Sequence, residues 1–241
     1  MWELIARAAQ TFGPAPMYTW VTDVSRIELS GTTFLNGVSK AANMLRDGLD
    51  VEDGESIYCN LGNHWQSPVW LAAAMSVQAV LDAQTQDALC VVDRDGIEFC
   101  SDARDIVIIS RDPFGMPERD LSTSVVNGSL EVRGYGDHFS AMGRFADIDV
   151  VCRTGESTKT KTQLVAAAQE LVAQHKLTST SRVAIDYVGD LTTRLLWQVI
   201  VPAVVGCSVV LIDGTVDIEA LVINERIDSF ITLSTTHDVK E

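Results

Sequence analysis

In the first half of the chain, segments whose hydrophobic residues have the spacing of a helix alternate with segments whose hydrophobic residues have the spacing of a strand. Helices are expected over residues 1–12, 32–49 and 65–80, and strands over 55–61, 89–93 and 106–110. Thr32 or Thr33 supplies a cap for the second helix, and Asp53-Gly54 forms a turn before the first strand. The Pro- and Gly-rich segment Asp112–Pro117 cannot be helical. This alternation is typical of a parallel sheet flanked by helices.

The second half shows the same alternation more regularly. Strands are expected over residues 148–152, 183–187, 209–212 and 229–233, and helices over 164–175, 191–204 and 218–226. Arg153–Thr160 is expected to be a polar loop, and right-handed crossovers should join the strands. The predicted fold class is α/β, with two lobes of mostly parallel sheet flanked by helices. The lobes are placed at residues 1–145 and 146–241, and they can pack as one domain.

The apolar run Leu195–Ile212 is long enough to cross a membrane. Pro202 and Gly206 interrupt it where a helix would end, and the β-branched segment Val209–Ile212 follows. A buried helix, turn and strand explain this pattern better than a membrane span, because strands covered on both faces are continuously apolar. No membrane association is therefore expected.

Charge and cysteine content restrict the partners. The chain has 33 acidic and 18 basic residues and a formal net charge of −15, which argues against nucleic acid and against an anionic membrane surface. Its five cysteines include no C-x-x-C pair, so no zinc site is expected. An odd number of cysteines in mostly apolar surroundings indicates reduced, buried thiols and a cytoplasmic location.

The segment from Arg153 to Thr162 is the strongest candidate for chemistry. It joins a predicted strand to a helix N-terminus, where unpaired backbone N–H groups favour anions, and it adds hydroxyls and two lysines. The alternative is a plain polar turn in which Thr160 or Thr162 caps the helix.

The same segment resembles the phosphate loop of acyl-adenylate-forming enzymes, which is rich in Ser, Thr and Gly and ends in Pro-Lys-Gly. The matching residues are Thr154, Gly155, Ser157 and Lys161, and together with Thr158 they are the candidate phosphate contacts. The flanks agree in order: the helical Ala41–Leu45, the turn Asp53–Ile57 and the Gly206–Leu211 strand occur where the family has its counterparts. The chain therefore looks like a short branch of this family that resembles its N-terminal part.

This resemblance implies ATP or AMP, with Mg²⁺, and an acyl group as ligands. However, Thr158 and Thr162 replace glycines, Thr160 replaces the proline, and Glu156 places a carboxylate where pyrophosphate would lie. The family's other nucleotide contacts and its mobile C-terminal domain follow the matched part. We therefore expect a pseudoenzyme or accessory protein that cannot complete adenylation alone, and we assign no catalytic or metal-binding residue.

Two other functions stay open. An interaction protein would use exposed apolar surface to form a homo-oligomer or bind a partner protein. A divergent P-loop NTPase would hold phosphates with Lys161 and Mg²⁺ with Thr162 and Asp213, since residues 155–162 match G-x-x-x-x-G-K-S/T except at Thr160. His64 and His138 are minor candidates for a base; a lone histidine is more often a surface or capping residue.

Overall fold

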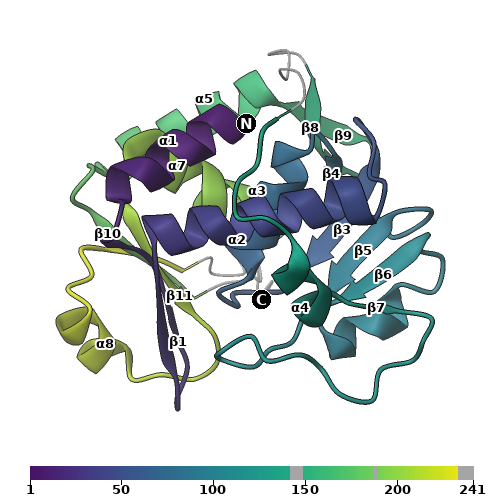
Figure 1. Ribbon diagram of the computed structural model, residues 1–241. Coiled ribbons are helices and arrows are strands. Elements are labelled where there is room, and N and C mark those ends of the chain that lie inside the picture. The colour runs from purple at the N-terminus through teal and green to yellow at the C-terminus, as the bar shows by residue number, and fades with distance from the viewer. Residues whose placement is uncertain (142–148, 187–188, 233–241) are drawn as a thin grey trace, which may run out of the picture.

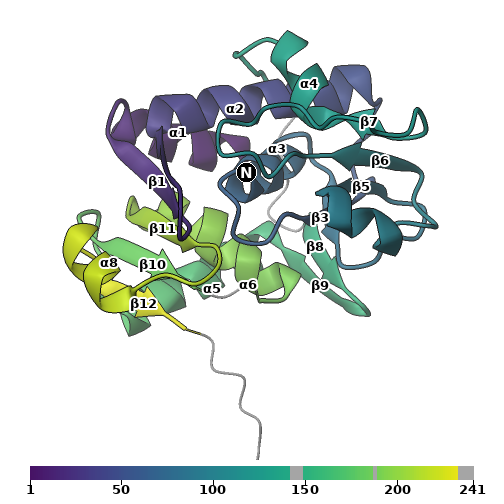
Figure 2. The same cartoon turned by 90° about the horizontal axis from the view of Figure 1, so that it is seen from below.

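Two sheets lie side by side and share helices between and above them (Figures 1 and 2). The computed structural model describes residues 1–141, 149–186 and 189–232. Most neighbouring strands in both sheets are parallel, and each sheet has an antiparallel pair at one edge. The predicted α/β fold of two mostly parallel sheets flanked by helices is confirmed.

The smaller sheet combines strands from the two ends of the chain. Its order is β12 (Ser229–Ile231), β10 (Arg182–Ile185), β11 (Ser208–Ile212), β1 (Pro16–Val21) and β2 (Arg26–Ser30). β1 runs parallel to β11 and antiparallel to β2. Five of the six residues of β1 are buried, because the strand lies between β11 and β2.

The larger sheet carries the segment predicted to bind phosphate. Its order is β7 (Val126–Asn127), β6 (Asp105–Ile108), β5 (Leu89–Val92), β3 (Ser56–Asn60), β4 (Val80–Asp82), β8 (Val150–Thr154) and β9 (Ser157–Thr160). All of its pairs are parallel except β8 with β9.

The helices cover these sheets and fill the space between them. They are α1 (Trp2–Phe12), α2 (Gly31–Asn43), α3 (Ser67–Ser76), α4 (Gly128–Glu131), α5 (Lys161–Gln174), α6 (Leu191–Leu195), α7 (Val201–Val205) and α8 (Ile218–Asn224). A π-helical segment, Leu196–Ile200, connects α6 to α7. α3 is buried at every position, which explains why its sequence is apolar all round. It therefore serves as the central element of the core.

Several predicted boundaries differ from the structure. Ser30, and not Thr32 or Thr33, caps α2, because its side chain accepts a hydrogen bond from the Thr33 amide. The helix expected over residues 65–80 ends at Ser76, and Val80 already belongs to β4. β1 and β2 were not predicted. The ends of the strands expected over 148–152, 183–187 and 229–233 fall partly outside the described residues.

The lobes predicted at residues 1–145 and 146–241 do not coincide with the two sheets. β1 and β2 join the smaller sheet, which otherwise comes from the C-terminal part of the chain. β8 and β9 join the larger sheet, which otherwise comes from the N-terminal part. The chain thus crosses between sheets after β2 and after β9, and the crossover expected from β8 through α5 leads into the other sheet.

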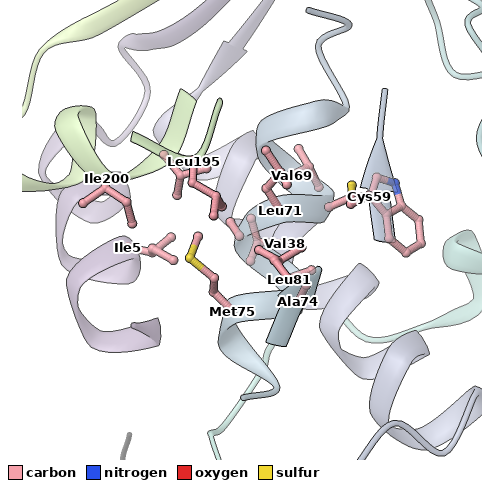
Figure 3. Close-up of a cluster of buried hydrophobic side chains, with 14 of the residues drawn as sticks. Ile5, Val38, Cys59, Val69, Leu71, Ala74, Met75, Leu81, Leu195 and Ile200 are labelled. Carbon is pink, nitrogen blue, oxygen red and sulfur yellow. The ribbon is translucent and has the colours of Figure 1, made fainter. Parts of the chain in front are cut away.

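One large hydrophobic core connects all of these layers. Figure 3 shows Ile5 of α1, Met75 of α3 and Ile200 of the π-helical segment gathered in one buried cluster. These residues are at most 1% exposed. Because strands and helices from both ends of the chain contribute to this cluster, the sheets are held in one packed unit.

The apolar run that resembled a membrane span forms a helix, a turn and a strand, as predicted. α6, the π-helical segment and α7 end at Gly206, whose left-handed backbone (φ 80°, ψ 24°) terminates the helix. β11 follows as a central strand of the smaller sheet. Within the described residues, no helix has the length and apolar character needed to cross a bilayer.

A buried carboxylate joins β2, β10 and the end of α8. Glu225 accepts hydrogen bonds of 2.6 Å from Arg26 Nε and from Arg182 Nη2, and its side chain is 7% exposed. The hydrogen bonds from Arg26 and then Arg182 outweigh burial and hold the pKa of Glu225 below its ordinary value of 4.5.

This depressed pKa predicts acid sensitivity. The stabilisation by Glu225 is complete above a pH of about 4.5 and is lost as pH falls through the folded-state pKa, because the unfolded chain takes up the proton more easily. Urea unfolding at a series of pH values should show that Glu225→Gln has a lower free energy of unfolding than the wild type at neutral pH. The difference between the two free energies should become smaller as the pH is lowered. Glu219→Gln, exposed on α8, is the control. A constant gap across this range would contradict the prediction.

Candidate functional site

The predicted phosphate loop is a tight β-hairpin. β8 and β9 pair antiparallel, Thr154 faces Ser157, and Gly155 and Glu156 form the turn between them. Gly155 has a φ of 59°, as expected for the first central residue of a type II′ turn. The expected polar loop over residues 153–160 is therefore wrong, because its β-branched threonines extend the strand pairing almost to the turn.

The hairpin brings the candidate phosphate contacts together at one edge of the larger sheet. Gly155, Ser157 and Thr158 are exposed, and Thr154 is half-buried. Lys161 is half-buried as the first residue of α5. The exposed carboxylate of Glu156 lies at the tip of the same hairpin.

A cap fixes the junction between the hairpin and α5. The Thr160 side chain accepts a hydrogen bond from the Gln163 amide, and the Gln163 side chain accepts one from the Thr160 amide. This capping box confirms the capping role considered for Thr160. It also uses N–H groups at the start of the helix that a bound anion would need.

An ion pair fixes the base of the hairpin to the sheet. Arg153 Nη1 lies 2.9 Å from Asp82 Oδ2, and the Asp82 side chain is 6% exposed at the end of β4. The hairpin is therefore held rigidly at its base, while its tip faces solvent.

The residues required of a P-loop NTPase do not share a site. Lys161 follows β9 in the larger sheet, whereas Asp213 follows β11 in the smaller one. Asp213 accepts a hydrogen bond from Trp20 Nε1 at 3.1 Å and pairs with Arg111. In a P-loop NTPase the loop joins a strand directly to a helix, but here the antiparallel β9 intervenes. This arrangement does not favour the NTPase alternative.

A second polar group, which we call the buried amide cluster (Asn63, Ser67 and Gln198), lies between the two sheets. Gln198 Nε2 donates to the Gly62 carbonyl and to Asn63 Oδ1 at 3.1 Å each, and Gln198 Oε1 accepts from Ser67 Oγ at 2.6 Å. Asn63 Nδ2 donates to the carbonyl of Ile212, at the end of β11. Because the amides are paired, the cluster acts as a link between the sheets.

The two candidate histidines have different environments. His64 is fully buried beside Trp20, with ring centroids 4.9 Å apart, so the surface role expected of it is wrong. Its Nδ1 accepts a hydrogen bond from the Gln66 amide, directly before α3. Burial, and then the charge of Arg111, lowers the pKa of His64 to about 3. The ring is thus neutral at physiological pH and is too weak a base for catalysis there. His138 is exposed in a turn, as expected of a surface residue.

Charged residues also join the carboxyl ends of the two sheets. Arg111, which follows β6, pairs with Asp93 after β5 at 3.1 Å and with Asp213 after β11. The sequence offered one signal for this region, namely polar residues directly after apolar strands.

Among residues 1–141, 149–186 and 189–232, no three His, Cys, Asp or Glu side chains are arranged to hold a metal ion.

Comparisons with known proteins give a clear result for the fold. An acyl-CoA synthetase of Brucella canis superposes with a TM-score of 0.78 at 13% identity, over 94% of this chain and 46% of that chain. A fatty acyl CoA synthetase of Mycobacterium tuberculosis gives 0.72 at 13% identity, over 94% and 47%. A long-chain-fatty-acid-CoA ligase of Archaeoglobus fulgidus gives 0.71 at 15% identity, over 92% and 48%.

The chain has the fold of the N-terminal half of an acyl-CoA synthetase. The predicted resemblance to acyl-adenylate-forming enzymes is thereby confirmed. In sequence, 132 residues are 33% identical to a protein of M. tuberculosis (strain ATCC 25618 / H37Rv) that is described only by a family designation, over 51% of this chain and 54% of that protein. No family model matches the sequence. The chain spans about half the length of these acyl-CoA synthetases.

Proposed function

We propose that this chain is a non-adenylating homologue of acyl-CoA synthetases, which keeps the fold for binding and not for catalysis. The supporting observation is the closed hairpin at residues 154–157, where the related enzymes need a phosphate loop. The five cysteines, all buried free thiols, fit a reducing, cytoplasmic setting for this role.

Backbone geometry supports this proposal. A phosphate loop surrounds its anion with backbone N–H groups, and glycines allow the close approach. Here Thr154 and Ser157 face each other across the strand pair, which leaves a turn of two residues. Thr158 and Thr162 carry β-branched side chains where the related enzymes have glycine. The hairpin therefore lacks a concave ring of donors.

Charge supports the proposal further. Glu156, at the tip of the hairpin, lies beside the residues that would contact a phosphate. Its negative charge would repel the negative charge of the phosphate. If ATP or AMP with Mg²⁺ binds at all, we propose that Thr154, Gly155, Ser157, Thr158 and Lys161 make the contact. Such binding would be a remnant of the family's activity, because Glu156 opposes the basic residues of the segment, Arg153, Lys159 and Lys161, and Arg153 is already paired with Asp82.

The test is nucleotide binding by calorimetry together with ATP–pyrophosphate exchange. The wild-type chain should show no exchange and should bind Mg·ATP no more tightly than about 1 mM, which corresponds to about 4 kcal/mol. Glu156→Gln should strengthen ATP binding several-fold, because it removes the repulsive charge, whereas Glu170→Gln, exposed further along α5, should not.

Two outcomes would refute the proposal. One is pyrophosphate exchange by the wild-type chain. The other is tight ATP binding that Lys161→Ala abolishes, because that would show a working phosphate site despite Glu156.

A protein partner or a second copy of this chain is the second candidate. Phe114 is 81% exposed, and Met116 and Leu130 are each 53% exposed. The loop that carries the first two is ordered, because Asp112 Oδ1 accepts hydrogen bonds from the amides of both and Arg133 donates to the Gly115 carbonyl. Rigidly held apolar side chains of this size favour burial against another surface.

A further inference from the structure

Two cysteines lie together on the face of the larger sheet that points away from the main core. Cys90 lies in β5, and Cys100 directly follows a short 3₁₀ helix, Arg94–Phe99, which we call the covering turn. A Cβ atom at Gly96 would lie 2.7 Å from Cβ of Val92, so the covering turn packs directly against β5. Both cysteines belong to a small hydrophobic cluster of four buried residues, whereas the neighbours of Cys90 along the strand belong to the main core.

The thiols of these two cysteines are adjacent. The Cys90 thiol donates a hydrogen bond to the sulfur of Cys100, and the Cys100 thiol donates to the Gly96 carbonyl at 3.4 Å. Burial, and then the hydrogen bond to Cys100, raises the pKa of Cys90. Burial also raises the pKa of Cys100, but the hydrogen bond that it accepts acts in the opposite direction. Cys100 is therefore the thiol of the pair that loses its proton more readily.

The cover over this pair is thin. The covering turn contains no buried residue, and Phe99, directly before Cys100, is 64% exposed. At its start the turn is held by Asp93, whose side chain accepts a hydrogen bond from the Gly96 amide. Segments with few buried apolar contacts open at a low cost in free energy. Opening of the covering turn would expose both thiols together and leave the main core closed.

We propose that Cys90 and Cys100 are a modification site at which a peroxide forms a reversible disulfide. The Cys100 thiolate attacks one peroxide oxygen, the O–O bond breaks, and the departing hydroxide takes up the proton that the thiol released. The Cys90 thiol then attacks the sulfur of the resulting sulfenic acid, the S–O bond breaks, and hydroxide leaves with the thiol proton as a second water. The two sulfurs are oxidised, the peroxide is reduced, and a dithiol reductant reverses the change.

The other three cysteines provide an internal comparison. Cys59, Cys152 and Cys207 belong to the main core, where Figure 3 shows Cys59. Burial is the largest cause that raises the pKa of their thiols, to about 12, 11 and 12. Because a peroxide could reach them only if the main core opened, these thiols should stay reduced while the pair is oxidised.

Mass spectrometry of the folded wild-type chain, after exposure to hydrogen peroxide and alkylation of the remaining thiols, tests this proposal. Trypsin cleaves after Arg94, between the two cysteines, so the disulfide should join two tryptic peptides. The disulfide should form at least about tenfold faster than any of the three core thiols is oxidised. Dithiothreitol should return both cysteines to thiols.

Two variants separate the roles of the cysteines. Cys90→Ala removes the second thiol, so Cys100 should accumulate as a sulfenic acid that dimedone labels. Cys59→Ala is the matched control and should leave the yield of the disulfide unchanged. Since Cys59 lies in the same tryptic peptide as Cys90, this variant also assigns the bond. Circular dichroism checks that both variants keep the fold.

Three outcomes for the wild-type chain would overturn the proposal. They are the absence of a Cys90–Cys100 disulfide after peroxide, its formation only in denaturant, and oxidation of the core thiols at the same rate. None of these outcomes depends on a nucleotide or on a protein partner, so the proposed function is tested separately.

Discussion

Replacing Gly31 with alanine is expected to destabilise the protein by about 3 kcal/mol or more, the largest effect that we expect for a single methyl group. A Cβ atom at this position would lie 2.1 Å from the carbonyl oxygen of Ala9 and 2.6 Å from Cβ of Phe12. Neither atom is the end of a flexible side chain, so α1 and α2 would have to move apart. Their contact forms part of the main core, and the damage would therefore spread through it.

Thermal unfolding and urea titration of Gly31→Ala measure this effect. The matched control is Gly134→Ala, where a Cβ atom would meet nothing within 4 Å. That control should unfold within about 0.5 kcal/mol of the wild type. A Gly31→Ala variant as stable as this control would show that α1 and α2 are not packed as closely as the structure has them.

Replacing Gln198 with leucine should cost about 3 kcal/mol, because buried hydrogen-bonding groups lose their partner. The side chain of Gln198 satisfies the Gly62 carbonyl, Asn63 Oδ1 and Ser67 Oγ, and the residue is 1% exposed. Leucine fills a similar volume but offers neither a donor nor an acceptor. The loss should therefore arise from unsatisfied polar groups and not from a cavity.

Denaturant unfolding compares this variant with Gln169→Leu, at an exposed position of α5, which should change stability by less than about 0.5 kcal/mol. The double variant Gln198→Leu/Ser67→Ala should recover part of the loss, because it removes one of the orphaned groups. Equal stability of Gln198→Leu and the wild type would contradict a linking role for the buried amide cluster.

Sequence periodicity was sufficient for the fold class but not for the topology. The helices α1, α5 and α8 and the strands β3, β5 and β11 lie close to where their hydrophobic spacing predicted them. Periodicity is a local property, however, and it does not specify which strands pair. The pairing of β1 with β11 joins residues about 190 positions apart along the chain, such as Tyr18 and Val209, and no local pattern predicts it.

The hairpin shows how a motif can be located correctly and still be given the wrong shape. Gly155 and the hydroxyl residues around it marked the segment, and the match to a phosphate loop led to the expectation of an open loop. The residues Ser157–Thr160 are polar on both faces, so they lack the hydrophobic alternation that normally indicates a strand. Their strand character comes from pairing with β8 at the sheet edge.

The buried polar residues could not be predicted from the sequence for a different reason. Asn63, His64 and Gln198 are polar residues that are buried only because the two sheets pack around them. Their burial depends on long-range packing, and the side chains of Asn63 and Gln198 form hydrogen bonds with residues more than 100 positions away. In the sequence, these polar residues are marked only by their position beside or within apolar segments.

The exchange of strands between the two sheets has a consequence for synthesis on the ribosome. β1 and β2 emerge first, but their neighbour β11 is translated some 190 residues later. Until then β1 exposes an unpaired edge and an almost wholly apolar sequence, the kind of surface that aggregates or recruits a chaperone. The nascent chain can therefore complete neither its smaller sheet nor the shared core before β11 has left the exit tunnel, and formation of this fold should be slow.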